Sequence, residues 1–176
     1  EGRGVPRDGG KAAAWYRKSA ETGNPDGQFN CGFACSHGIG RPPDYREAAA
    51  WFLRAAAQGH VEAQVNLGVL YRDGLGVQRD DLRALNWFAR AVEKEHPMAQ
   101  FFIGQMYEQG GGVPADEERA FRWYTKSAEH GNPRALNALG TFFYRGKGRP
   151  KDYEQAESYY RRAVWQGLPA AQNNLS

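Results

Sequence analysis

The sequence has few of the residue types that catalytic and metal sites need. Its 176 residues include only two cysteines and four scattered histidines. No apolar run approaches the roughly 18 residues of a membrane span, and no strand-like alternation appears. Acidic and basic residues are interleaved and the formal net charge is only +3, which does not favour binding to nucleic acid. We therefore expect no catalytic, metal or cofactor site, no nucleic-acid partner and no membrane span in this chain.

The cysteines, Cys31 and Cys35, stand four residues apart in a predicted helix. We favour the interpretation that they are two small core residues, because free cysteine behaves as a small hydrophobe. A helical pair at this spacing is poorly placed for a disulfide, and a metal site that included His37 would lack a convincing fourth ligand. Ser36 precedes His37 directly, and we expect the two side chains to diverge on a helix, which argues against a catalytic pair.

What the sequence does contain is a repeat with a period of 36 residues. The repeated columns hold an aromatic pair, an aspartate, an alanine and a glycine. The aromatic pairs are Trp15–Tyr16, Trp51–Phe52, Trp87–Phe88, Trp123–Tyr124 and Tyr159–Tyr160. The aspartates are Asp8, Asp44, Asp80, Asp116 and Asp152. A fixed period of this length is typical of a stacked array in which each repeat packs only on its neighbours.

Each repeat predicts two helices of about 13 residues, joined by short turns into a hairpin. Helix A follows a polar residue, which explains His60 and His96 as helix caps, and ends at a Gly-x-Gly loop. Helix B follows the aspartate, which caps its first turn. The aromatic pair should lie in the core, with Trp51 and Trp87 deeply buried. Helix B ends at a closing glycine, but Glu95 replaces this glycine in one repeat, so we expect that turn to be either strained or built differently.

The period divides the chain into one array of four full repeats with an incomplete repeat at each end. The full repeats are 24–59, 60–95, 96–131 and 132–167; residues 1–23 supply a helix B alone, and 168–176 begin a helix A. The chain opens within a repeat and without an initiating methionine, so we expect it to be part of a longer protein with any targeting signal outside it. Because neither end shows a polar cap, we also expect self-association through the ends or coverage by neighbouring repeats.

One full repeat reads Ala63-x3-Leu67-Gly68-x2-Tyr71-x2-Gly74-x-Gly76-Val77-x2-Asp80-x3-Ala84-x2-Trp87-Phe88-x2-Ala91. This pattern resembles the Sel1-like repeat, a relative of the tetratricopeptide repeat. The resemblance implies an all-α, right-handed superhelix, an α-solenoid of helix hairpins. It also implies an adaptor or scaffold role, with precedents in the bacterial cell envelope, secreted proteins, the endoplasmic reticulum and the cytosol, so it assigns no compartment.

The resemblance also leaves alternatives to a scaffold open. Some cysteine-rich Sel1-like proteins have been linked to β-lactam binding or hydrolysis, so a cell-wall-related hydrolase or small-ligand binder is the alternative function. This chain lacks their regular cysteine framework. A purely structural spacer is a further possibility.

By analogy with tetratricopeptide repeats, variable positions of helix A face the inner groove of the array. We expect a protein partner, as a peptide or a helix, to bind there. The candidate residues are Phe29, Phe33, Val65, Val69, Arg72, Phe101, Gln105, Glu108, Asn137 and Tyr144. The alternative is that some of these side chains tuck between neighbouring helices.

A basic column also recurs on helix B. It consists of Lys18, Arg54, Arg90, Lys126 and Arg162. A ligand-binding ladder is one interpretation. We favour the other, in which each long side-chain stem covers apolar surface while its charged head stays in water.

Overall fold

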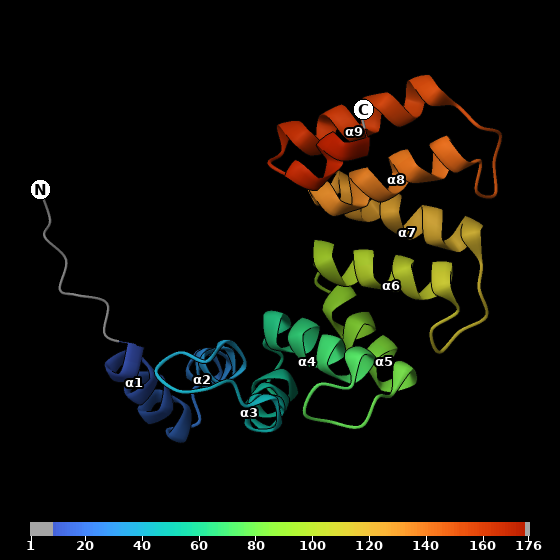
Figure 1. Ribbon diagram of the computed structural model, residues 1–176. Coiled ribbons are helices and arrows are strands. Elements are labelled where there is room, and N and C mark those ends of the chain that lie inside the picture. Colours follow the sequence, from blue (N-terminus) through green and yellow to red (C-terminus); the bar gives the residue numbers. More distant parts are fainter. Residues whose placement is uncertain (1–8, 175–176) are drawn as a thin grey trace, which may run out of the picture. The chain divides into compact units, whose positions relative to one another are not determined.

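The computed structural model describes residues 9–174, and within them it contains only helices, turns and loops (Figure 1). Nine α-helices of 12 or 13 residues and one 3-10 helix, η1, make up this part of the chain. Their bounds are α1 Gly9–Glu21, α2 Pro25–His37, α3 Tyr45–Ala57, α4 Val61–Asp73, α5 Asp81–Val92, α6 Pro97–Gln109, α7 Glu117–Glu129, α8 Pro133–Arg145, α9 Tyr153–Trp165 and η1 Pro169–Asn174. The all-α prediction of A and B helices in alternation is confirmed.

Aspartate caps four B helices, as predicted. Oδ1 of Asp44, Asp116 and Asp152 accepts a hydrogen bond from the backbone N–H three residues ahead, at 2.9, 2.8 and 2.9 Å. Asp80 accepts the equivalent bond at 2.9 Å. Each cap satisfies one of the first-turn N–H groups that have no partner inside the helix. The remaining aspartate of the column, Asp8, lies outside the described residues.

The A helices are capped less uniformly. Asn24 accepts from the N–H of Gly27 at 2.7 Å, and Nδ1 of His60 accepts from the N–H of Ala63 at 3.2 Å. His96 holds the same position before α6 but makes no side-chain cap bond to that helix. The capping interpretation is therefore confirmed for His60 and wrong for His96.

The glycine in the middle of helix A lies directly against an aromatic ring of helix B. A Cβ atom added at Gly32 would stand 2.8 Å from the ring of Phe52, and one added at Gly104 would stand 2.7 Å from the ring of Tyr124. Both distances are shorter than van der Waals contact allows. The glycine is needed in these two repeats because the ring packs onto the helix backbone itself.

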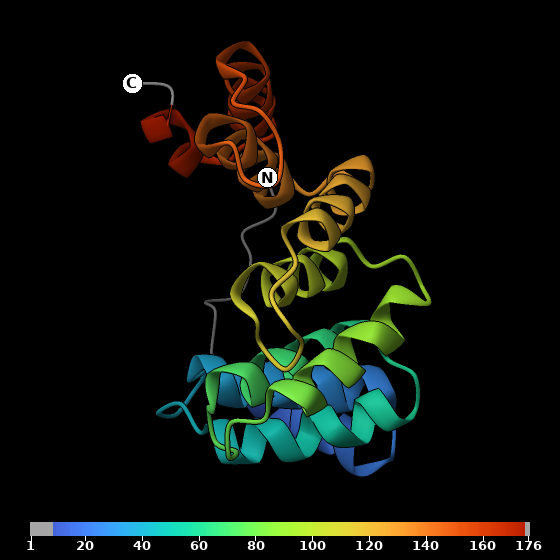
Figure 2. The ribbon, with the colours of Figure 1, turned by 90° about the vertical axis from the view of Figure 1, so that its right-hand side faces the viewer.

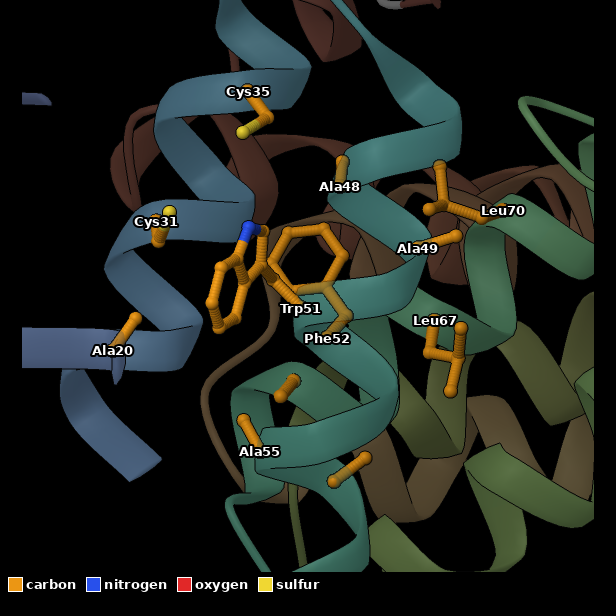
Figure 3. Packing of buried hydrophobic residues seen from close by; sticks show 12 residues of the cluster. Ala20, Cys31, Cys35, Ala48, Ala49, Trp51, Phe52, Ala55, Leu67 and Leu70 are labelled. Atoms are coloured by element: carbon orange, nitrogen blue, oxygen red, sulfur yellow. The ribbon is translucent and has the colours of Figure 1, made fainter. Parts of the chain in front are cut away.

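The second member of the aromatic pair is the more deeply buried one. Phe52 and Phe88 are 1% and 0% exposed, whereas Trp51 is 7% exposed and Trp87 is only partly buried. Figure 3 shows Trp51 and Phe52 extending together from α3 into the buried cluster. The prediction that both tryptophans are deeply buried is thus confirmed for Trp51 and wrong for Trp87.

Glu95 ends its repeat in the left-handed conformation, with φ at 56°. It is the one non-glycine residue with positive φ among residues 9–174. The closing residues of the other repeats have φ between 81° and 88°; they are Gly23, Gly59, Gly131 and Gly167. The backbone of the turn is therefore retained where the glycine is lost, and the glutamate carries the steric strain of that conformation.

We expect Glu95→Gly to raise the free energy of unfolding by up to about 1 kcal/mol, because glycine has no Cβ to clash in the left-handed region. Thermal unfolding followed by circular dichroism measures the change. Glu93→Gly, two residues earlier and without positive φ, is the matched control and should not stabilise the protein. Equal effects of the two substitutions would show that Glu95 is not strained.

The described chain divides within α5, between Trp87 and Phe88, into two compact units. We call them the N-terminal and the C-terminal unit. In the first, α2 packs on α1 and α3, and α3 on α4. In the second, α7 packs on α6 and α8, α9 on α8, and η1 on α9 (Figure 2). None of the helices within residues 9–174 is both long enough and apolar enough to cross a membrane.

Candidate functional site

Three aromatic side chains form a row along α2 in the N-terminal unit. Phe29 stacks on His60 of α4 with ring centroids 4.6 Å apart, and Phe33 stacks on His37 at 3.9 Å. Phe29 and Phe33 lie 6.2 Å apart, and Phe33 is 37% exposed. We call Phe29, Phe33 and His37 the aromatic row. His37 was not among the predicted groove residues, although its position four residues after Phe33 on one helix is a local signal for contact.

Two carboxylates flank the aromatic row at the start of α2 and of α4. Oδ1 of Asp26 lies 3.3 Å from Nε2 of His60, and Oε2 of Glu62 lies 3.3 Å from Nδ1 of the same ring. The Asp26 and Glu62 side chains are 79% and 57% exposed, whereas that of His60 is 11% exposed. The apolar surface of Phe29 therefore lies next to solvent-exposed negative charge.

The remaining candidates of the N-terminal unit differ in exposure. Val65 is 7% exposed and belongs to the core, as the tucked alternative supposed. Val69 is partly buried. Nε and Nη2 of Arg72 donate to the carboxylate of Asp73 at 2.7 and 2.9 Å. Val65 thus offers little surface to a partner, and the charge of Arg72 is neutralised by Asp73.

In the C-terminal unit Phe101 packs inward. It is 8% exposed, and its ring centroid lies 5.7 Å from that of Phe102 and 5.5 Å from that of Tyr124. The prediction that Phe101 lines an open groove conflicts with this burial, because its neighbours cover the ring.

Glu108 is engaged by its own unit. Its Oε2 accepts a hydrogen bond from the Tyr124 hydroxyl at 2.6 Å, and its other oxygen pairs with Nζ of Lys147. Burial raises the pKa of Tyr124, and the bond to Glu108 raises it further. Gln105, on the preceding turn, is partly buried. Glu108 on α6 therefore joins α7 and the loop that follows α8, rather than presenting a free carboxylate.

Tyr144 is the most open of the candidates. It is 53% exposed and meets Tyr153, itself 60% exposed, edge to face at 5.6 Å. The two rings border a pocket of about 230 Å³ that also includes Tyr160. Asn137 accepts a hydrogen bond from Nδ2 of Asn174 at 2.8 Å. Tyr153 was missed by the sequence analysis, because an exposed aromatic in the first turn of helix B has no distinctive spacing.

Ser36 and His37 come together, contrary to the sequence expectation. Ser36 Oγ lies 2.9 Å from His37 Nδ1, and both atoms lie 3.0 Å from the carbonyl oxygen of Phe33. The divergence predicted for neighbours on a helix is therefore wrong. The hydroxyl donates to the Phe33 carbonyl, an arrangement that occupies its proton with the backbone of the same helix.

The basic column of helix B stacks on aromatic rings. The cationic group of Arg54 lies 4.5 Å from the centroid of the Trp51 ring, and that of Lys126 lies 4.9 Å from the Trp123 centroid. Lys18 stands 5.5 Å from Trp15 in the same way. Each pair is three residues apart on one helix, at a distance that permits cation–π attraction. These contacts favour the interpretation that the column covers apolar surface.

Glu47 joins α3 to two other segments of the N-terminal unit. Its oxygens pair with the guanidinium groups of Arg17 and Arg41, and Oε1 accepts from Nε1 of Trp51 at 3.2 Å. Partial burial alone would raise the pKa of Glu47, but the hydrogen bonds from Arg41, Trp51 and Arg17 together outweigh it and lower the pKa to about 2.

This lowered pKa predicts a pH dependence of stability. The pKa of Glu47 falls from 4.5 to about 2 on folding, so its contribution is complete above about pH 4.5 and is lost as the pH falls towards 2. We expect the melting temperature of the wild type to drop more steeply across this interval than that of Glu47→Gln. Parallel profiles for the two proteins would contradict the predicted role of Glu47.

The model of the Sel1 repeat family matches five segments, residues 1–24, 25–60, 61–96, 97–132 and 133–167. The chain belongs to the Sel1-repeat family. Its 36-residue helix hairpins are Sel1 repeats, and the protein is a Sel1-repeat scaffold. None of the curated proteins compared with this chain matches it.

Solved Sel1-repeat structures resemble the chain closely. A Sel1 repeat protein from Oxalobacter formigenes is 36% identical to this chain, with a TM-score of 0.88. The match covers 98% of this chain and 70% of the Oxalobacter protein. The protein c5321, described as a protective antigen of uropathogenic Escherichia coli strains, is 35% identical with a TM-score of 0.84. The match covers 96% of this chain but only 36% of c5321. The immunity protein Pa5087 of Pseudomonas aeruginosa, at 21% identity and a TM-score of 0.68, shares the fold.

Proposed function

We propose that this Sel1-repeat protein is a non-catalytic scaffold that binds a segment of a partner protein, a peptide or a helix, on the helix-A surface of its N-terminal unit. The observation that carries the proposal is the aromatic row on α2. Phe33 keeps 37% of its surface exposed although it stacks on His37 and neighbours Phe29. Pre-ordered aromatic side chains at a surface bind partners with little loss of conformational entropy.

In the C-terminal unit two of the predicted groove residues, Phe101 and Glu108, are already engaged, and Tyr144 alone among them is widely exposed. Phe101 is covered by Phe102 and Tyr124, and Glu108 binds Tyr124 and Lys147. A partner that approached these side chains would first have to displace contacts within the unit. The exposed phenylalanine on α2 requires no such displacement.

The charges next to the aromatic row suggest the chemistry of the partner. Asp26 and Glu62 are exposed beside the Phe29–His60 stack. A partner segment with an apolar anchor and a neighbouring lysine or arginine would cover the phenylalanines and meet these carboxylates. We therefore propose an amphipathic segment of that kind as the ligand.

The arrangement of Ser36 and His37 supports the proposal that the protein is not an enzyme. The Ser36 hydroxyl donates to the Phe33 carbonyl, and the imidazole lies flat on the Phe33 ring. A serine nucleophile needs its proton directed at a base, and the base needs an orienting partner. Here both side chains are held by Phe33, which suits a role in shaping the aromatic row.

Selection of random displayed peptides on the purified chain tests the proposal. We expect the selected peptides to share an aromatic or large aliphatic residue near a basic one. Phe33→Asp should weaken their binding by at least about tenfold, which corresponds to 1.4 kcal/mol. Circular dichroism should show the helicity unchanged, because Phe33 lies at the surface.

Leu53→Asp is the matched control. Leu53 lies on the B helix α3 and is 45% exposed, so the substitution places the same charge on a similarly exposed apolar residue outside the aromatic row. Peptide binding should survive it. Equal losses of peptide binding in the two variants would rule out the proposed surface. So would the selection of peptides that lack a basic residue and bind Phe33→Asp as well as the wild type.

A further inference from the structure

The first full repeat has small residues where the other repeats fill their core. At three columns of helix A it carries Cys31, Ala34 and Cys35. In the other repeats the column of Cys31 holds Leu67, Ile103 and Leu139. The column of Ala34 holds Leu70, Met106 and Phe142, and the column of Cys35 holds Tyr71, Tyr107 and Phe143. Those of the first two columns are buried, with Leu67 at 1% and Leu70 at 5% exposure. The side-chain volume that closes the core elsewhere is therefore missing beside α2.

A pocket occupies the position of the missing side chains. It has a volume of about 280 Å³ and lies between α1, α2 and the loop that follows α2. Its lining is mostly apolar, and it also includes both thiols; the lining residues are Ala13, Ala14, Arg17, Cys31, Ala34, Cys35, Ile39 and Arg41. An apolar cavity of about 150 Å³ is enough to hold benzene. This pocket is large enough for an aromatic ring.

The two thiols of the pocket come from the same face of α2. Cys31 and Cys35 are free, 3% and 2% exposed, and one turn apart on α2 (Figure 3). Both side chains line the same pocket. In addition, Nη2 of Arg41 donates to Sγ of Cys35 at 2.8 Å. Because residues four apart on a helix are neighbours on one face, a single atom inside the pocket can approach both sulfurs.

The protonation of these thiols restricts the ligand class. Burial raises the pKa of Cys31 to about 11 and also raises the pKa of Cys35. Reagents and divalent metal ions that need thiolates are disfavoured, because both thiols are protonated at neutral pH. No cluster of three or more metal-ligating side chains occurs in residues 9–174 to complete a metal site. A ligand that brings its own proton acceptor avoids this cost.

We propose that the pocket binds a trivalent arsenical with a small apolar substituent, R–As(OH)2, bridged between Cys31 and Cys35. Each arsenic–oxygen bond is replaced by an arsenic–sulfur bond, and each departing hydroxide leaves with the proton of one thiol. The products are the cyclic dithioarsenite and two molecules of water, and arsenic stays trivalent throughout. The guanidinium of Arg41 stabilises the negative charge that develops on Cys35 sulfur, while Ala13, Ala34 and Ile39 contact the apolar substituent.

Phenylarsine oxide, which hydrates to such a compound, is the probe. We expect the reduced chain to take up one equivalent, to lose both titratable thiols and to gain the mass of one phenylarsenic group. Excess dithiol should release the adduct, whereas monothiol should not. Cys31→Ser and Cys35→Ser should each weaken binding by at least about a hundredfold, because the second bond of a chelate forms at a high effective concentration.

Ala34→Leu tests the pocket separately from the thiols. It installs the side chain that Leu70 has in the next repeat, keeps both cysteines, and fills the space for the phenyl ring. We expect it to weaken binding of phenylarsine oxide much more than binding of arsenite, which has no ring. The helicity of each variant is checked by circular dichroism.

Two results would overturn the proposal. If either serine variant binds phenylarsine oxide as tightly as the wild type, the thiols do not act as a pair. If Ala34→Leu binds it without loss, the pocket does not receive the substituent.

Discussion

Replacing Phe52 with alanine is expected to lower the free energy of unfolding by about 3–5 kcal/mol, because the loss of a buried ring leaves a cavity in addition to the lost transfer energy. Phe52 is 1% exposed, lies against the backbone of Gly32, and has its ring 5.9 Å from that of Phe29. The substitution therefore loosens α2 and α3 together. Chemical or thermal unfolding measured by circular dichroism gives the difference.

Trp15→Ala is the matched control for this substitution. Trp15 is the first member of the aromatic pair in its own repeat, whereas Phe52 is the second member of its pair. The Trp15 side chain is 69% exposed. Its removal should change stability by no more than about 0.5 kcal/mol, as is usual at surface positions. Similar losses for Phe52→Ala and Trp15→Ala would mean that the second aromatic of the pair is not the core residue.

Gly104→Ala is expected to destabilise the protein by about 1–3 kcal/mol, the usual cost of overpacking. Alanine is favoured over glycine by about 1 kcal/mol in a helix interior, so propensity alone predicts the opposite sign. The added Cβ would stand 2.7 Å from the ring of Tyr124, whose hydroxyl is held by Glu108 at 2.6 Å. The ring cannot retreat without breaking that hydrogen bond.

A double-mutant cycle separates these two effects. In a Tyr124→Ala background the steric conflict is gone, and Gly104→Ala should become neutral or stabilising by up to about 1 kcal/mol. The coupling energy between the two positions should then exceed about 0.5 kcal/mol. Stabilisation by Gly104→Ala in the otherwise unchanged protein would contradict the close packing of Tyr124 on α6.

The local features of the fold were predictable because their causes lie within a few residues of sequence. The Asp44 side chain accepts a hydrogen bond from the N–H of the residue three positions ahead. The repeated aspartate alone therefore indicates where α3 begins. The glycines in the column of Glu95 indicated a left-handed turn in the other repeats, but only the structure showed that Glu95 keeps it. The period likewise determined the alternation of A and B helices.

The candidate site depended on contacts that the repeat does not encode. Tyr124 and Lys147 engage Glu108 from 16 and 39 residues away, so a carboxylate assigned to an open groove became an internal partner. Phe101 has the same helical position as Val65, and both proved buried because neighbouring side chains cover them. Exposure of a variable position depends on the sizes of those neighbours rather than on its place in the repeat.

By itself the sequence determined the helix hairpin, the aspartate caps of the B helices, and membership of a Sel1-type array. Only the tertiary structure decided which aromatic of each pair fills the core, as the contrast between Trp87 and Phe88 shows. It also decided that small residues at Cys31 and Ala34 leave a pocket instead of a collapsed core. The physical reason is that turns and caps form within one segment, whereas packing is the joint result of side chains from several helices.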